Sequence, residues 1–211
     1  MARTAHGEGT PISGTTASHS HARAMRYGIF ATAALMLVLS SAAVTASTNR
    51  ERSDEVVKEA EATIMTAGKS NPVDTQMVNK AIDDLHQALK IDPRNDSAYV
   101  DLGFCYGLLR DPSTAQDMYR TATLINPSPA NFKELADIYL RVGDAEAALM
   151  AANAGLVKDP HNAKLFNAKG LALSDLQRPD EAEQAFKRAL EYDPSLEVAR
   201  QNLDAMKAKN R

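Results

Sequence analysis

One short phrase recurs four times in this chain at an almost constant spacing. It reads LKIDPRN, TLINPSP, LVKDPHN and LEYDPSL, and its prolines are Pro93, Pro127, Pro160 and Pro194, which lie 34, 33 and 34 residues apart. Proline cannot continue a helix and disfavours helical backbone at the residue before it, so each phrase predicts a helix end followed by a tight turn. The segments between the turns are therefore expected to be copies of one helical unit.

Apolar residues between two of these turns indicate that each unit is a pair of helices. They follow the i, i+3, i+4, i+7 spacing of one helix face twice in each unit. In the first unit these positions are Tyr99, Leu102, Gly103 and Tyr106, then Ala115, Met118, Tyr119 and Ala122. The break between the two sets, RDPST, supplies a turn and an N-cap candidate. The next two units repeat the arrangement, the first of them with a turn at Gly143.

This pattern resembles the tetratricopeptide repeat in both residue types and period. Three complete repeats cover residues 96–196, and KAIDDLHQALKIDP forms a preceding half repeat, so repeats are expected over residues 77–196. Residues 47–76 are expected to form an irregular helical linker with the first helix, and residues 197–211 a capping helix. The resemblance implies an all-α solenoid of stacked helical hairpins.

The N-terminal region does not follow the repeat. Residues 1–26 are rich in Gly, Ser, Thr and His without apolar periodicity, and we expect them to be disordered. Residues 27–46 carry no charge across 20 positions, which predicts a transmembrane helix, with arginines before it that favour a cytoplasmic N-terminus and repeats outside the cytoplasm, in the periplasm of a bacterium. The alternative is a signal peptide cleaved near Ala46, which would leave a secreted or periplasmic protein.

Composition and motifs argue against several classes of function. A net charge of −3 gives no footprint for nucleic acid, and the single cysteine, Cys105, lies in an apolar run that favours a buried hydrophobic role. We find no nucleophile with a base, no phosphate loop and no metal-binding cluster, and we interpret His19 and His21 as incidental. The acidic residues of the helix faces and turns are expected to be solvated. The sequence therefore predicts no enzyme activity, no cofactor, no metal and no small-molecule substrate.

The resemblance implies that the first helices of successive hairpins line a concave groove that binds a protein or peptide segment. The residues expected to face this groove are Val100, Phe104, Leu108, Lys133, Asp137, Arg141, Lys164, Asn167, Leu171 and Asp175. Relatives that grip a terminal carboxylate use basic and asparagine residues at places occupied here by Val100, Phe104, Glu134 and Ala168, which disfavours that mode. An N-terminal helix that covers Val100 and Phe104 is the competing expectation.

Together these features predict a membrane-tethered adaptor that mediates protein–protein interaction or assembles an envelope complex, with membrane or envelope proteins as its expected partners. The alternative is a stoichiometric structural subunit of a large membrane protein complex, in which the membrane helix and the repeats both pack on neighbours.

Overall fold

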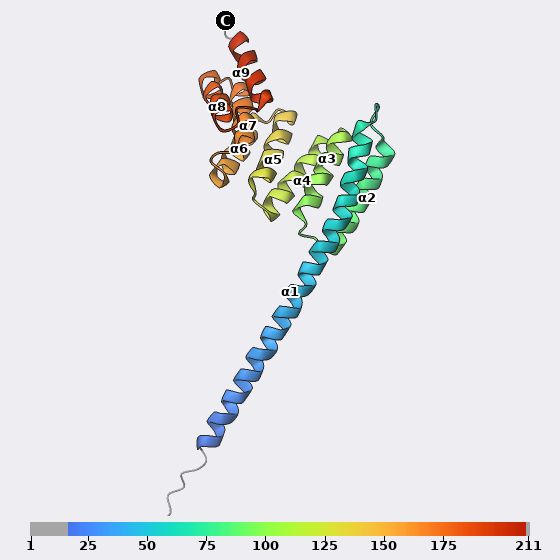
Figure 1. Cartoon of the computed structure of the whole chain (residues 1–211), viewed down its shortest axis with the longest axis vertical. Helices are drawn as coiled ribbons and strands as arrows, with labels where there is room; N and C mark the ends of the chain where they lie inside the picture. The colour runs from blue at the N-terminus through green and yellow to red at the C-terminus, as the bar shows by residue number, and fades with distance from the viewer. Residues whose placement is uncertain (1–16, 210–211) are drawn as a thin grey trace, which may run out of the picture. The chain divides into compact units, whose positions relative to one another are not determined.

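The computed structural model of this protein describes the backbone of residues 17–209 and the side chains of residues 43–208. In this part of the chain the secondary structure is entirely α-helical (Figure 1). The helices are α1 (Ala17–Lys69), α2 (Thr75–Ile91), α3 (Asp96–Leu108), α4 (Pro112–Ile125), α5 (Pro129–Val142), α6 (Ala145–Lys158), α7 (Ala163–Asp175), α8 (Pro179–Tyr192) and α9 (Glu197–Lys209). The predicted all-α class is confirmed.

The chain divides into two compact units, residues 1–48 and residues 49–211. We call the second unit the repeat domain. The sequence predicts no helix before Tyr27, whereas α1 begins at Ala17. Residues 17–26 contain no glycine or proline and several alanine and arginine residues, a composition that favours helix. The rest of the tail that is expected to be disordered, residues 1–16, lies outside the described residues, as do the side chains of His19 and His21.

The predicted membrane segment, residues 27–46, falls mostly outside the residues whose side chains are described. Its backbone forms part of α1. Within the described part of the chain, no helix combines the length and the apolar character needed to cross a bilayer. The membrane segment therefore stays a prediction from the amino-acid sequence.

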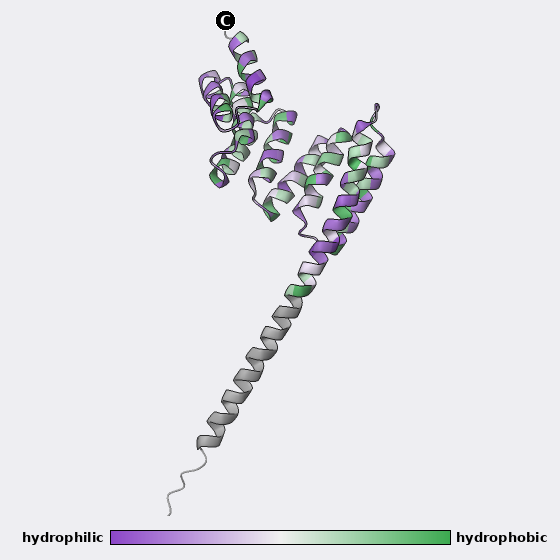
Figure 2. Cartoon of the chain, viewed as in Figure 1, coloured by the Kyte–Doolittle hydropathy of each residue, from purple (hydrophilic) through white to green (hydrophobic). Residues whose placement is uncertain are grey.

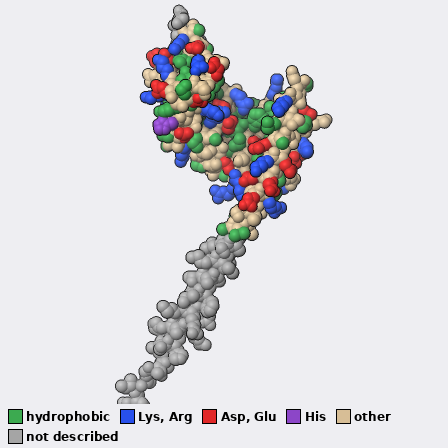
Figure 3. All heavy atoms as spheres, in the orientation of Figure 1, with side chains coloured by type: hydrophobic (Ala, Val, Ile, Leu, Met, Phe, Trp, Pro, Cys, Tyr) green, Lys and Arg blue, Asp and Glu red, His purple; other side chains and the backbone are tan. Residues whose placement is uncertain are grey.

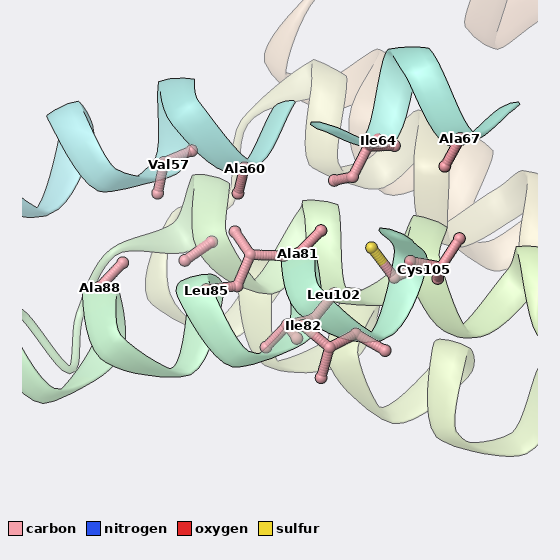
Figure 4. Packing of buried hydrophobic residues seen from close by; sticks show 12 residues of the cluster. Val57, Ala60, Ile64, Ala67, Ala81, Ile82, Leu85, Ala88, Leu102 and Cys105 are labelled. Carbon is pink, nitrogen blue, oxygen red and sulfur yellow. The ribbon is translucent and has the colours of Figure 1, made fainter. Parts of the chain in front are cut away.

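In the repeat domain, the end of α1 packs against α2 and α3 to form the first hairpin. Val57, Ala60, Ile64 and Ala67 of α1 are buried and face the buried residues of α2 and α3 (Figure 4). Cys105 is fully buried in this cluster, as predicted. Burial, and to a lesser extent the negative charge of the nearby Asp101 carboxylate, raises the pKa of the Cys105 thiol to about 12. The expected half repeat thus has a helical partner, which the sequence placed only within residues 51–68.

A polar junction also holds the start of this α1 segment against the repeats. The Arg50 guanidinium lies 3.1 Å from Asp54, 3.6 Å from Asp92 and 3.1 Å from Asp96. Beside it, Asn95 Nδ2 donates to Ser53 Oγ at 2.8 Å, and Ser53 Oγ donates to a carbonyl of α2 at 2.9 Å. Each of these buried polar groups has a partner, so α1 is fixed to the α2–α3 connection by side chains as well as by apolar packing.

The recurring phrase closes α2, α6 and α8 with the same turn, whereas Asn126 at the end of α4 donates its side-chain N–H to Asp96. Asp92 accepts a hydrogen bond from the Arg94 N–H at 3.0 Å, and Asp193 accepts one from the Ser195 N–H at 3.0 Å. These local bonds explain why an aspartate precedes the proline, since its side chain satisfies the backbone N–H of the turn residue that follows the proline. The first helices then begin at side-chain N-caps, which include Asn95 and Asn162.

Two further clusters complete the core of the repeat domain. One joins α4 to α7 and the other joins α7 to α9. Alanine supplies many of the buried positions, which allows neighbouring helices to approach closely. Along α2–α9, hydrophobic and hydrophilic residues are interspersed, as expected for helices with one buried face (Figure 2). On α9, Leu203 and Met206 are buried in one cluster with residues of α7 and α8.

Candidate functional site: a groove along the first helices

A groove of about 640 Å³ runs over the first helices of the repeat domain. Its lining residues come from α3, α4, α5, α7 and the start of α9. They are Phe104, Tyr119, Lys133, Glu134, Asp137, Leu140, Arg141, Lys164, Asn167, Leu171, Leu196 and Val198. Hydrophobic and charged side chains lie next to each other in the hollow of the repeat domain in Figure 3. A surface of this mixed character suits a segment of another protein.

Seven of the ten residues that the sequence assigned to a groove lie in this lining. They are Phe104, Lys133, Asp137, Arg141, Lys164, Asn167 and Leu171. The other three lie elsewhere: Val100 packs against the cluster that joins α4 to α7, Leu108 packs against the α1–α3 cluster, and Asp175 is exposed outside the groove.

Phe104 is the exposed aromatic residue of the groove. Its side chain is 47% exposed, although α1 packs on the same helix through other positions. The competing expectation, in which the N-terminal helix covers Phe104, is therefore wrong. Val100 is partly buried, but by residues of the α4–α7 cluster.

Charged residues on α5 form a local network within the groove. Lys133 Nζ lies 3.1 Å from Glu134 Oε1 and 2.9 Å from Asp137 Oδ2. Burial disfavours the charged form of Lys133, but the hydrogen bond and Coulombic attraction of Asp137 outweigh it, and the pKa of the lysine is raised. This lysine therefore remains protonated and pairs with both carboxylates, and the three groups together carry one net negative charge.

The sequence pattern does not identify several of the lining residues. Leu196 directly precedes the C-terminal cap, and Val198 lies in the first turn of that amphipathic helix, in which Leu203 and Met206 are buried. Val198 is instead 47% exposed and lines the groove. Asn202 of α9 donates a hydrogen bond to Asn167 Oδ1 at 2.9 Å, which holds the cap beside α7. No pattern in the sequence indicates that the cap reaches this far.

The groove shows no arrangement for covalent chemistry among the described residues. The one deeply perturbed carboxylate, Asp101, lies on α3 but does not line the groove. The Oδ2 atom of Asp101 is buried without a hydrogen-bond partner. Burial, and to a lesser extent repulsion from the Glu61 carboxylate, raises the pKa of Asp101 to about 7. The expectation that the acidic residues of the helices are solvated is therefore wrong for Asp101.

Comparison with known proteins adds to this geometry. The tetratricopeptide repeat family model matches residues 163–196. The small glutamine-rich tetratricopeptide repeat-containing protein 2 of Mycosarcoma maydis is 32% identical to the chain over 99 residues, which are 46% of this chain and 28% of that protein. The chain thus spans less than a third of that relative's length.

Solved structures share the fold. The structure of PilF of Pseudomonas aeruginosa is similar with a TM-score of 0.67 at 17% identity, over 78% of this chain and 71% of that chain. The first repeat domain of Spaghetti (RPAP3), bound to an HSP90 peptide, is similar with a TM-score of 0.52 at 22% identity, over 56% of this chain and 94% of that chain. The chain is therefore an all-α solenoid of helical hairpins with a tetratricopeptide repeat at residues 163–196.

Proposed function

We propose that this protein is a non-enzymatic, membrane-tethered scaffold that holds a segment of a partner protein in the groove of its repeat domain. The observation that carries this proposal is the groove itself, in which an exposed aromatic side chain lies among charged residues of α5 and α7. Proteins built from tetratricopeptide repeats generally mediate protein–protein interactions, and the RPAP3 domain of similar fold holds a peptide. The same use of the groove is expected here.

The membrane tether in this proposal rests on the amino-acid sequence. Residues 27–46 are uncharged and long enough to span a bilayer as a helix, and Arg3, Arg23 and Arg26 precede them. The proposed arrangement is a cytoplasmic N-terminus with the repeats outside the cytoplasm, where membrane or envelope proteins are the expected partners. Cleavage near Ala46 is the alternative, and it gives a secreted or periplasmic scaffold with the same groove.

A second candidate function is a permanent structural subunit of a large membrane complex. The observation in its favour is that second helices also expose large apolar side chains. Leu124 of α4 is 83% exposed, and Met150 and Val157 of α6 are 72% and 79% exposed. Apolar residues at these positions suit a lasting contact with a neighbouring subunit.

Replacement of Phe104 by alanine tests the scaffold proposal. The full chain and the Phe104→Ala variant are purified from membranes in mild detergent, and the proteins that stay bound are identified with their molar ratio. We expect the variant to lose roughly 1–4 kcal/mol of binding free energy, the range for an interface anchor. The fold should be retained, because a half-exposed side chain leaves less of a cavity than the core residues whose loss costs roughly 3–5 kcal/mol.

The outcomes separate the two candidates. A partner released by Phe104→Ala supports the groove. A partner that remains in fixed ratio with Phe104→Ala, but is released by Leu124→Ser or Val157→Ser, supports the structural subunit and contradicts the groove proposal. A large loss of thermal stability in Phe104→Ala, comparable to a core cavity, would show that the residue acts in folding.

Protease accessibility tests the proposed topology. Protease added to intact cells whose outer barrier has been permeabilised should digest the repeats while it spares cytoplasmic proteins. Mass determination of the mature protein supplies the second readout, because a chain that begins at Ser47 has lost the segment as a signal peptide. Protection of the repeats until the inner membrane is lysed would place them in the cytoplasm and contradict the proposal.

A further inference from the structure

Two cations of the groove have no ion-pair partner among the described residues. Arg141 on α5 and Lys164 on α7 both line the groove, and their side chains form neither an ion pair nor a hydrogen bond in this part of the chain. Lys164 is attracted only at a distance by Asp193, which lies outside the lining. The lining holds three cations and two carboxylates, a net charge of +1, and both carboxylates contact Lys133 rather than Arg141 or Lys164. Because α5 packs against α7, the two cations come from neighbouring helices.

Arg141 is an exposed residue whose side chain lies against α3. Its guanidinium lies against Gly107 of α3, where an added Cβ would be only 3.3 Å from the nearest nitrogen. The absence of a side chain at Gly107 therefore leaves the space that Arg141 occupies beside α3. A guanidinium placed in this way is suited to a carboxylate, which it can bind with two parallel hydrogen bonds.

Apolar side chains are exposed on α3 and α9, the first and last of the helices that line the groove. Phe104 comes from α3 and Val198 from α9, and each side chain is 47% exposed. Leu171 of α7 also lines the groove. The recognition surface thus combines two unpaired cations from the middle helices with an apolar residue from each of the outer ones.

The chain's own ends do not complement this surface. Residues 1–26 contain one carboxylate, Glu8, against three arginines. The charged side chains among the last residues, KAKNR, are all basic. A second copy of either end would therefore bring positive charge to Arg141 and Lys164. Charge complementarity favours a different protein.

We propose that the occupant of the groove is an internal segment of a partner protein in which acidic residues lie between two large apolar side chains. Its carboxylates bind Arg141 and Lys164, and its apolar residues contact Phe104 and Val198. This inference rests on the proposed function and specifies the chemistry of the partner.

The test measures the binding of synthetic peptides to the full chain in detergent by fluorescence anisotropy. The reference peptide has phenylalanine, a run of aspartate and glutamate, and leucine, with a labelled N-terminus and an amidated C-terminus. Three companions replace the acidic run by lysine, replace it by glycine and serine, or replace both apolar ends by serine. A fourth leaves the reference C-terminus as a free carboxylate. We expect tightest binding by the reference peptide, with or without the free carboxylate, and weaker binding as salt is added.

Charge-removing variants of the protein identify the cations that act. We expect Arg141→Gln and Lys164→Gln each to weaken binding of the reference peptide by roughly three- to tenfold, and the double variant by more. Val198→Ala should weaken it by at least about threefold. Arg120→Gln and Lys187→Gln are the matched controls, because both residues are exposed on second helices away from the groove, and they should bind as the unaltered protein does. Circular dichroism melting confirms that each variant folds.

Several results would overturn the inference. Equal binding of the glycine–serine or lysine peptide, unaltered affinity of both charge variants, or no binding of any peptide would each do so. A strict requirement for the free carboxylate would show terminal capture instead of an internal segment. Self-association that depends on Arg141 would make a second copy the occupant.

The proposed function can survive such a failure. Binding of the glycine–serine peptide that is lost in Phe104→Ala would leave the groove as a protein-binding site and remove only the acidic specificity. If no peptide binds and the native partner is retained by Phe104→Ala, both proposals fail.

Discussion

Two glycines of the first helices are required by aromatic rings on the helices that follow. Gly103 lies under Tyr119, and a Cβ there would be 2.9 Å from the ring. Gly170 lies under Phe186, where the distance would be 2.5 Å. The middle repeat has alanines, Ala136 and Ala152, at the corresponding positions. Small and large residues are therefore matched within each hairpin, which is how a repeat can vary its residues and keep its helix spacing.

We predict that Gly103→Ala and Gly170→Ala destabilise the repeat domain. Alanine favours helix over glycine by about 1 kcal/mol, but an overpacked core costs roughly 1–3 kcal/mol and rings held between helices cannot move away freely. Gly170→Ala should have the larger effect. Thermal unfolding of the full chain measures both. Gly68→Ala is the control, since no atom lies within 4 Å of the added Cβ, and it should not lower the melting temperature.

Asp101 predicts a pH dependence of stability. Its pKa is raised from 3.8 to about 7, mainly by burial. Between these values the folded state retains a proton that the unfolded state has lost, so the free energy of unfolding falls as the pH rises through this range. The total loss is at most about 4 kcal/mol, at 1.36 kcal/mol for each unit of pKa.

The variant Asp101→Asn should remove this component. Its stability relative to the unaltered protein is expected to be greater at about pH 8 than at about pH 5, because the amide cannot ionise. Urea unfolding at the two pH values gives the comparison. Asp117→Asn, at an exposed position of α4, serves as the control and should show no such change. An equal effect of Asp101→Asn at both pH values would contradict the assignment.

Among the elements, the turn inside each of the hairpins α3–α4, α5–α6 and α7–α8 has one residue with left-handed backbone. Gly143 has φ 82°, and the equivalent residues Arg110 and Gln177 have φ 59° and 57°. Glycine adopts this conformation without the steric cost that a Cβ brings. Two of the three hairpin turns therefore use a residue that is unfavourable for its conformation.

Adding a glycine and removing a glycine at these turn positions should change the free energy of unfolding in opposite directions. We predict that Arg110→Gly and Gln177→Gly each stabilise the protein by about 0.5–1 kcal/mol, and that Gly143→Ala destabilises it by about 1 kcal/mol or more. Melting temperatures of the purified variants provide the measurement. Arg120→Gly, within α4, is a control of opposite sign, because glycine inside a helix costs about 1 kcal/mol. Destabilisation by Arg110→Gly would show that its side chain contributes more than its backbone strain costs.

Across the repeat domain as a whole, each hairpin depends on its neighbour. Leu203 and Met206 of α9 are buried in one cluster with Leu173 of α7 and Phe186 of α8. In the described part of the chain this face of the α7–α8 hairpin is covered by α9. The capping helix therefore supplies the contact that another repeat supplies elsewhere.

Deletion of residues 197–211 should lower both the melting temperature and the solubility of the protein, because Phe186 and Leu173 become exposed. The deletion also removes Val198 from the groove, so peptide binding should weaken with it. A shorter deletion, residues 207–211, removes no member of the buried cluster and is the matched control. Unchanged melting and solubility after the longer deletion would contradict the capping role.

The helical hairpins and their period can be predicted from the amino-acid sequence alone, because each depends on local chemistry. The Asp-Pro and Asn-Pro turns and the apolar spacing act over a few residues, and they can be recognised before the fold is known. The buried place of Cys105 follows from the apolar run in which it lies. The first helix of the half repeat is harder to place, since the family pattern is missing from residues 51–68 and its partners on α2 are identified only by packing.

Which side chains share the groove depends instead on packing between helices. Val100 and Leu108 have the spacing of groove residues, yet they are partly buried against the core clusters, whereas Val198, in the helix that the sequence assigns to the cap, lines the groove. Helical periodicity gives the direction of a side chain relative to its own helix. The rotation of that helix against its neighbours is set by the contacts between them, and those contacts also bury Asp101 without a partner.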